Sequence, residues 1–201
     1  IDGKEIPLPS EAEALTGNIY LDLSPRQASG KRLEIVRQDG VPAWGAVLRQ
    51  YVAPAASVKA QSMPQLSVTK QLLPIEMTQG GEKAGKSATS FSKGDLIRVT
   101  MTLVTDRDLD YVLIRDQRGA FMQPQSQLTS YTVEDGLWVL RETRNSATNF
   151  YLTHLPKGQY IITYDVYADR DGEYSTGIAT AQSQYYPMIT AHSAGCIVKV
   201  E

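Results

Sequence analysis

Hydrophobic and polar residues alternate with a period of two along several stretches of the chain, which is typical of half-buried antiparallel strands. The longest stretch covers residues 159–168 and follows a Pro-Gly turn. Its predicted buried face carries Tyr160, Ile162, Tyr164 and Val166. Residues 96–105 repeat the pattern, and their predicted buried face carries Ile97, Val99, Met101 and Leu103.

Similar but shorter patterns predict many further strands, separated by glycine and proline turn signals. These strands are expected at residues 18–23, 32–38, 42–52, 66–77, 109–115, 131–133, 137–143, 149–154, 172–176 and 189–201. A helical turn is expected only at 11–15 and within 177–186, and the missing long helical periodicity excludes a doubly wound α/β fold. The sequence therefore predicts an all-β chain built as an antiparallel, immunoglobulin-like β-sandwich.

Residues 53–64 are rich in Ala, Ser and Pro and show no periodicity, so they are predicted to connect two domains. We expect a partial β segment over residues 1–60, with Trp44 as a core anchor, and a β-sandwich over residues 61–201. Residues 78–93 are polar and glycine-rich and are expected to form a mobile hairpin loop.

Composition excludes several function classes. The formal net charge of −2 offers no phosphate-binding surface, so no nucleic-acid partner is expected. No apolar run reaches the length of a membrane span, so no direct membrane insertion is expected. The chain begins at Ile1 and shows no signal peptide, and we expect it to be a processed or excised piece of a longer protein.

The residues suited to nucleophilic or metal chemistry are few. Cys196 is the single cysteine and is predicted to be a small buried hydrophobe on the face shared by Val198 and Val200. His192 lies too far up the same strand to act as its base, and His154 is expected at a strand end. The sequence thus predicts no catalytic, cofactor-binding or metal residue, and hence no cofactor and no enzyme.

Two local patterns imitate known sites. Asp106, Asp108 and Asp110 have the spacing that opens a calcium loop, but Tyr111 and Gln117 stand where that loop needs Gly and Glu. Turn aspartates that accept backbone hydrogen bonds are the simpler interpretation, and a looser calcium site is the alternative, with Asp169 and Asp171 as further ligands. Residues 80–87 match Gly-x-x-x-x-Gly-Lys-Ser, but the helix that a phosphate loop requires does not follow.

Six aromatic residues are spread over the predicted strands, and packing within the core or across strands is the default expectation. An aromatic platform that binds sugar is the alternative. The residues are Tyr111, Tyr131, Trp138, Tyr151, Tyr160 and Tyr164.

An ordered series of motifs resembles the C-terminal macroglobulin-type domain of bacterial alpha-2-macroglobulins. Gly94-Asp95-Leu96-Ile97-Arg98-Val99 resembles its opening strand, and residues 105–112 resemble its next turn and strand. Asn149-Phe150-Tyr151-Leu152, Leu155-Pro156-Lys157-Gly158-Gln159-Tyr160, Tyr185-Tyr186-Pro187-Met188 and Ser193-Ala194-Gly195 follow in the family's order. Residues 1–4 and 42–47 resemble the preceding segment, which finishes a split sandwich beside the helical thioester domain.

The resemblance implies a non-catalytic structural and interaction domain of a large periplasmic or cell-envelope protein, a broad-spectrum inhibitor that traps proteases by conformational change. Its expected partners are other domains of the same chain and, through the parent protein, target proteases. The family's Cys-x-Glu-Gln thioester motif is absent, because Ile197, Val198 and Lys199 follow Cys196. The alternative is a stand-alone sandwich that binds carbohydrate or protein.

Overall fold

The computed structural model describes residues 1–9, 19–36, 40, 42, 47 and 52–201. The chain divides into two compact units, Ile1–Gln50 and Tyr51–Glu201. We describe each unit by itself. Trp44 and the helical turn predicted at 11–15 lie outside the described residues.

The described part of the first unit is organised around one short helix, α1 (Pro25–Ala28). Ser24 begins it with a capping box, in which the Ser24 backbone amide donates to Gln27 Oε1 at 3.0 Å. Asp2 Oδ1 accepts the amide of Arg32 at 2.9 Å. Residues 19–23 and 32–36, the described parts of the strands predicted at 18–23 and 32–38, are not strands in the structure.

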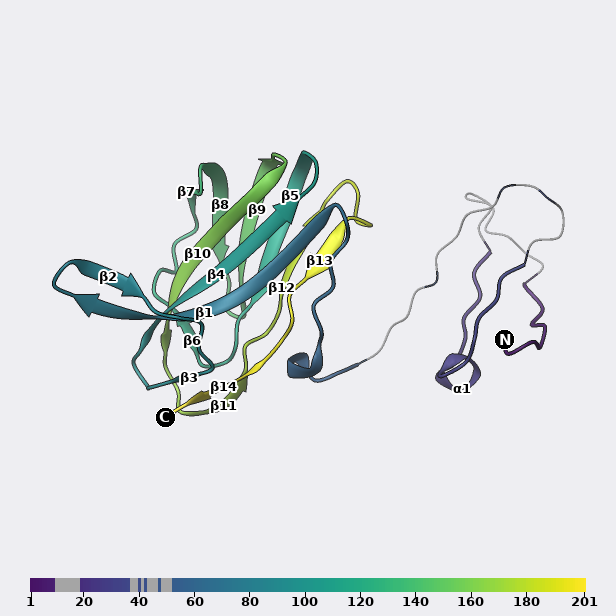
Figure 1. Ribbon diagram of the computed structural model, residues 1–201, viewed down its shortest axis with the longest axis horizontal. Helices are drawn as coiled ribbons and strands as arrows, with labels where there is room; N and C mark the ends of the chain where they lie inside the picture. Colours follow the sequence, from purple (N-terminus) through teal and green to yellow (C-terminus); the bar gives the residue numbers. More distant parts are fainter. Residues whose placement is uncertain (10–18, 37–39, 41, 43–46, 48–51) are drawn as a thin grey trace. The chain divides into compact units, whose positions relative to one another are not determined.

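The second unit is a sandwich of antiparallel sheets (Figure 1). The five-stranded sheet has the order β2 (Gly81–Ala84), β1 (Leu66–Thr78), β4 (Leu96–Thr105), β10 (Gly158–Ala168), β6 (Met122–Pro124). The six-stranded sheet has the order β13 (Thr190–His192), β12 (Ala179–Ser183), β5 (Leu109–Gln117), β9 (Ala147–Leu155), β8 (Leu137–Thr143), β7 (Ser130–Glu134). The sandwich predicted from the sequence is thereby confirmed.

A small third sheet closes one end of the sandwich. Its order is β11 (Gly172–Ser175), β14 (Ile197–Val200), β3 (Ser90–Phe91), and β14 pairs with β3 in parallel. A single 3-10 turn, η1 (Ala55–Ser57), precedes the sandwich. No helix among the described residues is long and apolar enough to cross a membrane.

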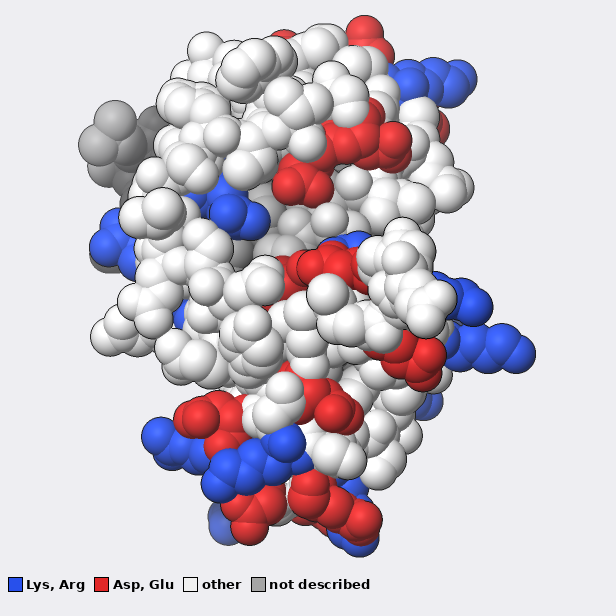
Figure 2. All heavy atoms as spheres, turned by 90° about the vertical axis from the view of Figure 1, so that its left-hand side faces the viewer, with Lys and Arg blue, Asp and Glu red and all other residues white. Residues whose placement is uncertain are grey.

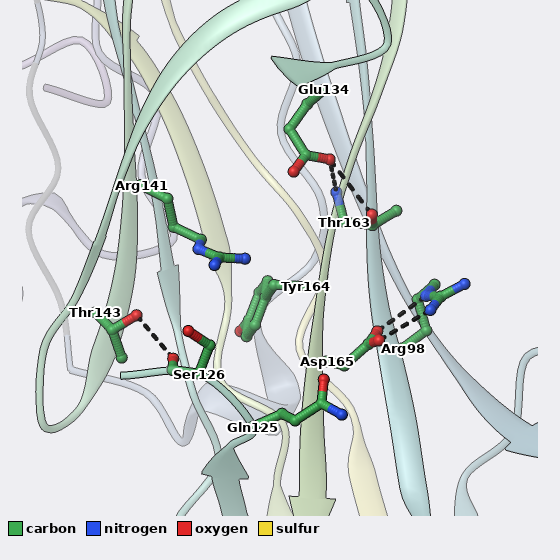
Figure 3. A pocket seen from close by; sticks show the side chains of 9 residues that line it. All are labelled: Arg98, Gln125, Ser126, Glu134, Arg141, Thr143, Thr163, Tyr164 and Asp165. Carbon is green, nitrogen blue, oxygen red and sulfur yellow. Dashed lines mark hydrogen bonds and ion pairs between the residues drawn. The ribbon is translucent and has the colours of Figure 1, made fainter. Parts of the chain in front are cut away.

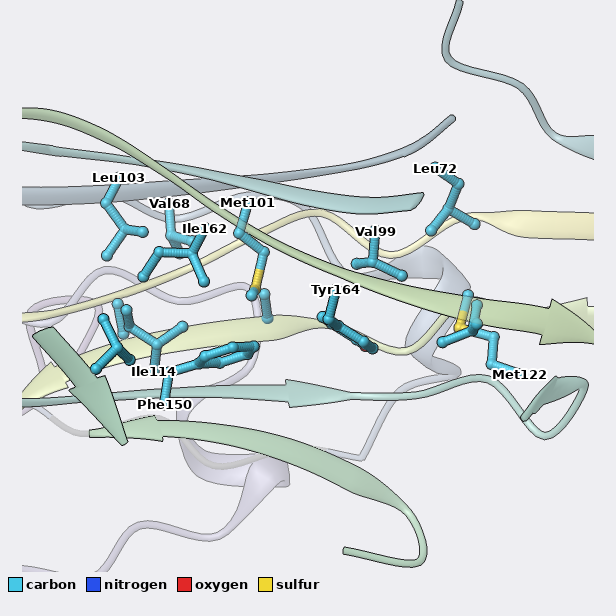
Figure 4. Close-up of a cluster of buried hydrophobic side chains, with 14 of the residues drawn as sticks. Val68, Leu72, Val99, Met101, Leu103, Ile114, Met122, Phe150, Ile162 and Tyr164 are labelled. Carbon is cyan, nitrogen blue, oxygen red and sulfur yellow. The ribbon is translucent and has the colours of Figure 1, made fainter. Parts of the chain in front are cut away.

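The core lies between the inner faces of the two large sheets (Figure 4). Alternate residues of β4 and β10 point into it, as their pattern predicts, and Ile97, Val99 and Ile162 are fully buried. Phe150 and Ile114 meet them from the six-stranded sheet and are also fully buried. Burial of this size is the main force that holds the two sheets together.

Two predictions about the C-terminal part of the sandwich were wrong. The helical turn expected within 177–186 is strand β12, because Ala179 to Ser183 pair with Asp116 to Val112 of β5 and thereby satisfy their backbone groups. Short runs of small residues carry too weak a pattern to distinguish these two outcomes. The last predicted strand, 189–201, is interrupted and forms β13 and β14.

The segment predicted to connect two domains, residues 53–64, lies within the second unit, Tyr51–Glu201. The amide of Gln61 donates to His192 O at 2.9 Å, and the amide of His192 donates back to Gln61 O at 2.8 Å. The amide of Gly195 donates to Val58 O at 3.0 Å. These bonds fix the segment, and the division between the units falls at residues 50 and 51.

Candidate functional site

A buried ion pair joins the two sheets. Lys70 of β1 and Asp116 of β5 lie 2.6 Å apart (Nζ to Oδ1), and their side chains are 3% and 0% exposed. The Lys70 ammonium also donates to the carbonyls of Thr176 at 2.9 Å and Gln117 at 3.3 Å. The hydroxyl of Tyr164 donates to Asp116 Oδ2 at 2.5 Å. Each charge therefore has several partners, as burial requires.

The surroundings of this pair suit a structural role. Burial, followed by the charge of Asp116, raises the pKa of Tyr164 well above its ordinary value, so the phenol stays protonated. Arg118 lies nearby and donates to Thr148 Oγ1 at 2.6 Å and to Asn145 O at 2.9 Å. Burial lowers the pKa of this guanidinium from its ordinary value. The Lys70 and Asp116 side chains are too deeply buried to reach a substrate.

A polar cleft of about 220 Å³ opens where β10 of one sheet faces β7 and β8 of the other. Figure 2 shows a hollow, with basic and acidic side chains around it, on the face of the molecule that carries β7 and β2. The cleft is lined by Arg98, Gln125, Ser126, Glu134, Arg141, Thr143, Thr163, Tyr164 and Asp165 (Figure 3).

Most of the charged groups in the cleft are already paired. Arg98 forms a fork with Asp165, with Nε to Oδ1 at 2.9 Å and Nη2 to Oδ2 at 2.8 Å, and also reaches Glu82 at 3.1 Å. The hydrogen bonds to Asp165 are the main cause that raises the pKa of Arg98. Glu134 Oε2 accepts the backbone amide of Thr163 at 3.3 Å and its hydroxyl at 3.4 Å.

Two carboxylates, Glu134 at the end of β7 and Asp135 in the turn after it, also protect the unpaired edge of β10. Asp135 Oδ2 accepts the amide of Ile161 at 3.0 Å, beside the bond from Thr163 to Glu134. These amides would otherwise offer an open strand edge to another chain. Asp135 holds the left-handed backbone angle φ of 47° that this tight turn needs, followed by Gly136 at 81°.

The outer face of the six-stranded sheet carries two rows of apolar side chains. Register places Tyr131 opposite Leu140 and Leu140 opposite Tyr151, which in turn lies opposite Leu113. In the next row Val133 pairs with Trp138, whose side chain is 72% exposed. We call these six residues the outer apolar face. It is a sheet surface of the kind that packs against another protein surface.

The aromatic residues singled out in the sequence therefore divide between two environments. Tyr164 is buried in the core and Tyr160 packs against it, as expected for packing residues. Tyr131, Trp138 and Tyr151 are exposed on the outer apolar face. Tyr111 is about half exposed and meets the ring of Tyr185 edge-on, with the ring centroids 5.0 Å apart.

Cys196 is exposed, so the prediction that it is a buried hydrophobe was wrong. It precedes β14 rather than lying within it, while Val198 and Val200 are buried as predicted. The Cys196 amide donates to Thr176 Oγ1 at 3.3 Å, and its carbonyl accepts the Thr176 amide at 3.0 Å. These backbone bonds fix the residue at the end of the sheet, and its Sγ lies 3.6 Å from Thr176 Oγ1.

The structure brings His154 to Asp110, which the sequence did not predict. The distance from Nδ1 to Oδ1 is 2.7 Å, and the two side chains are 52% and 68% exposed. The pair lies on neighbouring strands β9 and β5, outside the cleft. His192 is elsewhere, on the edge strand β13, with Nδ1 3.1 Å from Ser193 O.

The candidate calcium ligands do not converge among the described residues, where no cluster of three metal-binding side chains occurs. Asp106 pairs with Arg107 at 2.8 Å, and Asp108 Oδ1 accepts the amide of Lys157 at 2.7 Å. Asp169 and Asp171 pair with Arg170 and Lys93.

The phosphate-loop pattern at 80–87 lies in a hairpin rather than before a helix. Residues 81–84 form strand β2, which pairs with β1. Gly85 continues this edge, with its amide donating to Pro74 O at 2.8 Å. The backbone amides are therefore not gathered to hold a phosphate.

The charged side chains of the buried pair and the cleft were not identified from the sequence, although the sequence contains a pattern that indicates them. Lys70 follows Leu66 and Val68 at the inward spacing of β1, and Asp116 follows Val112 and Ile114 in β5. A charged residue at a core-facing position is the pattern to look for, since such groups are rarely buried without a partner. Arg141 follows Leu137 and Val139 in β8 by the same rule.

Comparison with known proteins places the chain in a family. Residues 66–187 match the model of the bacterial alpha-2-macroglobulin MG10 domain. The comparison with curated proteins gives no match.

Solved structures share the fold. A Salmonella alpha-2-macroglobulin mutant (Y1175G) matches 73% of this chain with a TM-score of 0.61 and 18% identity, and the match covers 10% of that chain. The native Escherichia coli alpha-2-macroglobulin, in a structure spanning domain MG7 to the C-terminus, matches 74% of this chain at 0.59 and 15% identity, covering 25% of that chain. The chain thus spans between a tenth and a quarter of the length of these relatives.

The family model covers more than half of the chain and includes every strand of the two large sheets except β13. The chain therefore belongs to the bacterial alpha-2-macroglobulin family and contains its MG10 domain.

Proposed function

We propose that this chain is the C-terminal, non-catalytic structural and interaction domain of a macroglobulin-type, broad-spectrum protease inhibitor that traps proteases by a change of conformation. The observation that carries the proposal is the continuous family match over residues 66–187. The deeply buried Lys70–Asp116 pair adds support, because it fastens the two sheets and suits a domain that moves as a rigid body.

The expected partner of the sandwich is another domain of the same polypeptide. The matched structures are chains several times longer, of which this fold is only one part. The outer apolar face supplies a surface for such packing, with Trp138 as its most exposed aromatic anchor. Large aromatic side chains of this kind dominate the energy of protein interfaces.

Residues 1–60 are proposed to be the end of the split sandwich that flanks the thioester domain in this family. Strands of a split unit need partners supplied from elsewhere in the polypeptide. We propose a periplasmic or cell-envelope location for the parent protein, by analogy with the family, and target proteases as its partners.

A stand-alone sandwich that binds carbohydrate or protein is the second candidate, and the observation that favours it is the same outer apolar face. The two functions differ in what covers this face. In an inhibitor it is covered by another domain, whereas in a binding module it stays accessible in the native protein.

The activity of a protease, measured after it is mixed with the parent protein, separates these two functions. A trapped protease keeps its activity towards a small peptide substrate and loses activity towards a large protein, because the large substrate cannot enter the trap. Trp138→Ser in the parent should weaken this protection. Val104→Ser, which removes an exposed side chain from the other sheet, should leave it unchanged. Full activity towards both substrates after mixing with the parent would refute the proposed function.

A further inference from the structure

Three ionisable residues occupy inward positions on strands of the sandwich, where apolar residues precede them. Lys70 and Asp116 neutralise one another at 2.6 Å. The third, Arg141 on β8, follows the buried residues Leu137 and Val139 and has no such counterpart. An unpaired charge at this position does not stabilise the core, because burial of a charge costs free energy unless the charge is paired.

The guanidinium of Arg141 is half-buried and points from β8 into the polar cleft, towards Tyr164 (Figure 3). Its Nε is buried and makes no hydrogen bond with any described residue. None of the ion pairs among the described residues includes it. The side chain thus presents its hydrogen-bond donors to the cleft.

The two acidic residues that line the cleft are committed elsewhere. Asp165 is held in the fork with Arg98, and Glu134 accepts both hydrogen bonds from Thr163. On the wall below Arg141, the Thr143 hydroxyl donates to Ser126 O at 3.3 Å. The hydroxyl of Ser126 and the amide of Gln125 add neutral donors to the same space (Figure 3).

The volume and the charged groups of the cleft indicate which class of ligand it can bind. A volume of about 220 Å³ exceeds the ~150 Å³ of an engineered cavity that binds benzene, so one small organic group fits. The planar fork of a guanidinium matches a carboxylate with two parallel hydrogen bonds. The neighbouring carboxylates of Glu134 and Asp165 disfavour a doubly charged anion such as phosphate.

We propose that this cleft is a binding site for a single carboxylate, held by Arg141 and assisted by the neutral donors of Ser126 and Gln125. The carboxylate comes either from a Glu or Asp side chain of a protein segment or from a small free acid. The chemistry is shared by both sources. The proposal does not depend on the function proposed above, because it uses only side chains of this sandwich.

The test is a titration of the 201-residue chain followed by NMR of its arginine Nε–H groups, with the Arg141 signal assigned from an Arg141→Lys variant. The probes are acetate and a short peptide with one Glu, and the matched controls are acetamide and the same peptide with Gln. We expect saturable movement of the Arg141 signal with both carboxylate probes and none with the amides. Peptide binding about tenfold tighter than acetate binding would identify a protein segment as the source, and equal binding would identify a free acid.

Variants separate this site from general attraction of anions. Arg141→Gln should weaken acetate binding about tenfold or more, whereas Arg115→Gln, which removes an exposed arginine from the same sheet, should not change it. Glu134→Gln should leave binding intact or strengthen it. No movement of the Arg141 signal with either carboxylate, or equal movement with chloride, would overturn the proposal. The proposal would also be overturned if the wild type did not bind acetate and Glu134→Gln did. In that case Glu134 would be the internal partner of Arg141.

Discussion

Replacement of Lys70 by Met tests the most deeply buried polar contact of the fold. The change removes the ammonium that lies 2.6 Å from Asp116 Oδ1 and leaves a fully buried carboxylate with the Tyr164 hydroxyl as its remaining partner. Breaking a buried pair by removing one partner costs about 3–5 kcal/mol of the free energy of unfolding. Met matches the length of the Lys stem, so little packing is lost.

The assay is urea unfolding of the 201-residue chain followed by far-ultraviolet circular dichroism. Lys93→Met is the matched control, because Lys93 is 61% exposed and lies 3.7 Å from Asp171. The control should change stability by no more than about 0.5 kcal/mol. The double variant Lys70→Met with Asp116→Asn should recover part of the loss, since the amide is neutral and still accepts from Tyr164.

Two results would refute this reasoning. One is a loss below about 1 kcal/mol in Lys70→Met, which would mean that the carboxylate is solvated or neutralised in another way. The other is a double variant as unstable as the single one. In that case the loss would come from packing and not from an unpaired charge.

Three further predictions concern other parts of the sandwich. Hydrogen bonds from Asn149, then Arg144 and Tyr151, lower the pKa of Glu142 from 4.5 to about 2. The ionised carboxylate therefore stabilises the fold above pH 4.5, and this stabilisation is lost as the pH falls towards 2. The difference in the free energy of unfolding between the wild type and Glu142→Gln should shrink over that range, and a constant difference would contradict the prediction. Cys196 should react completely with a thiol reagent in the native protein, and protection until unfolding would contradict its exposure. Gly177→Ala should destabilise the sandwich strongly in thermal unfolding, because a Cβ there would lie 2.0 Å from Gln117 O at a φ of +69°; Gly136→Ala, which has a positive φ and open space, should cost less.

The long strands could be predicted from the sequence because their alternation is strong. Residues 96–105 and 137–143 form strands with the predicted bounds, and β10 begins one residue before its predicted start. In each case one face is buried in the core and the other is not, which is the condition under which a period of two appears. The sandwich class follows from these strands alone.

The remaining elements depend on contacts that no local pattern contains. Strand β12 is made of small residues and exists because β5 and β13 pair with it on both sides. The segment before β1 lacks periodicity and is nevertheless fixed by its bonds with His192 and Gly195. Both cases are tertiary effects that override weak local preferences.

The candidate cleft is of the same kind. Arg98 and Asp165 come from strands β4 and β10, and Arg141 comes from the opposite sheet, so only the packing of the two sheets brings them together. The sequence offered one clue, which is a charged residue at an inward position of β8. Whether such a residue is paired, like Lys70, or directed into a cleft, like Arg141, is decided by the opposite sheet.

The most direct test of the account is the mass of the native polypeptide in its source cells, measured with an antibody raised against residues 61–201. If the sandwich is one domain of a macroglobulin-type inhibitor, the band should be many times larger than the 22.2 kDa of this chain and should shift after treatment with a protease. A stable native product near 22.2 kDa would contradict the account and would favour a stand-alone binding module.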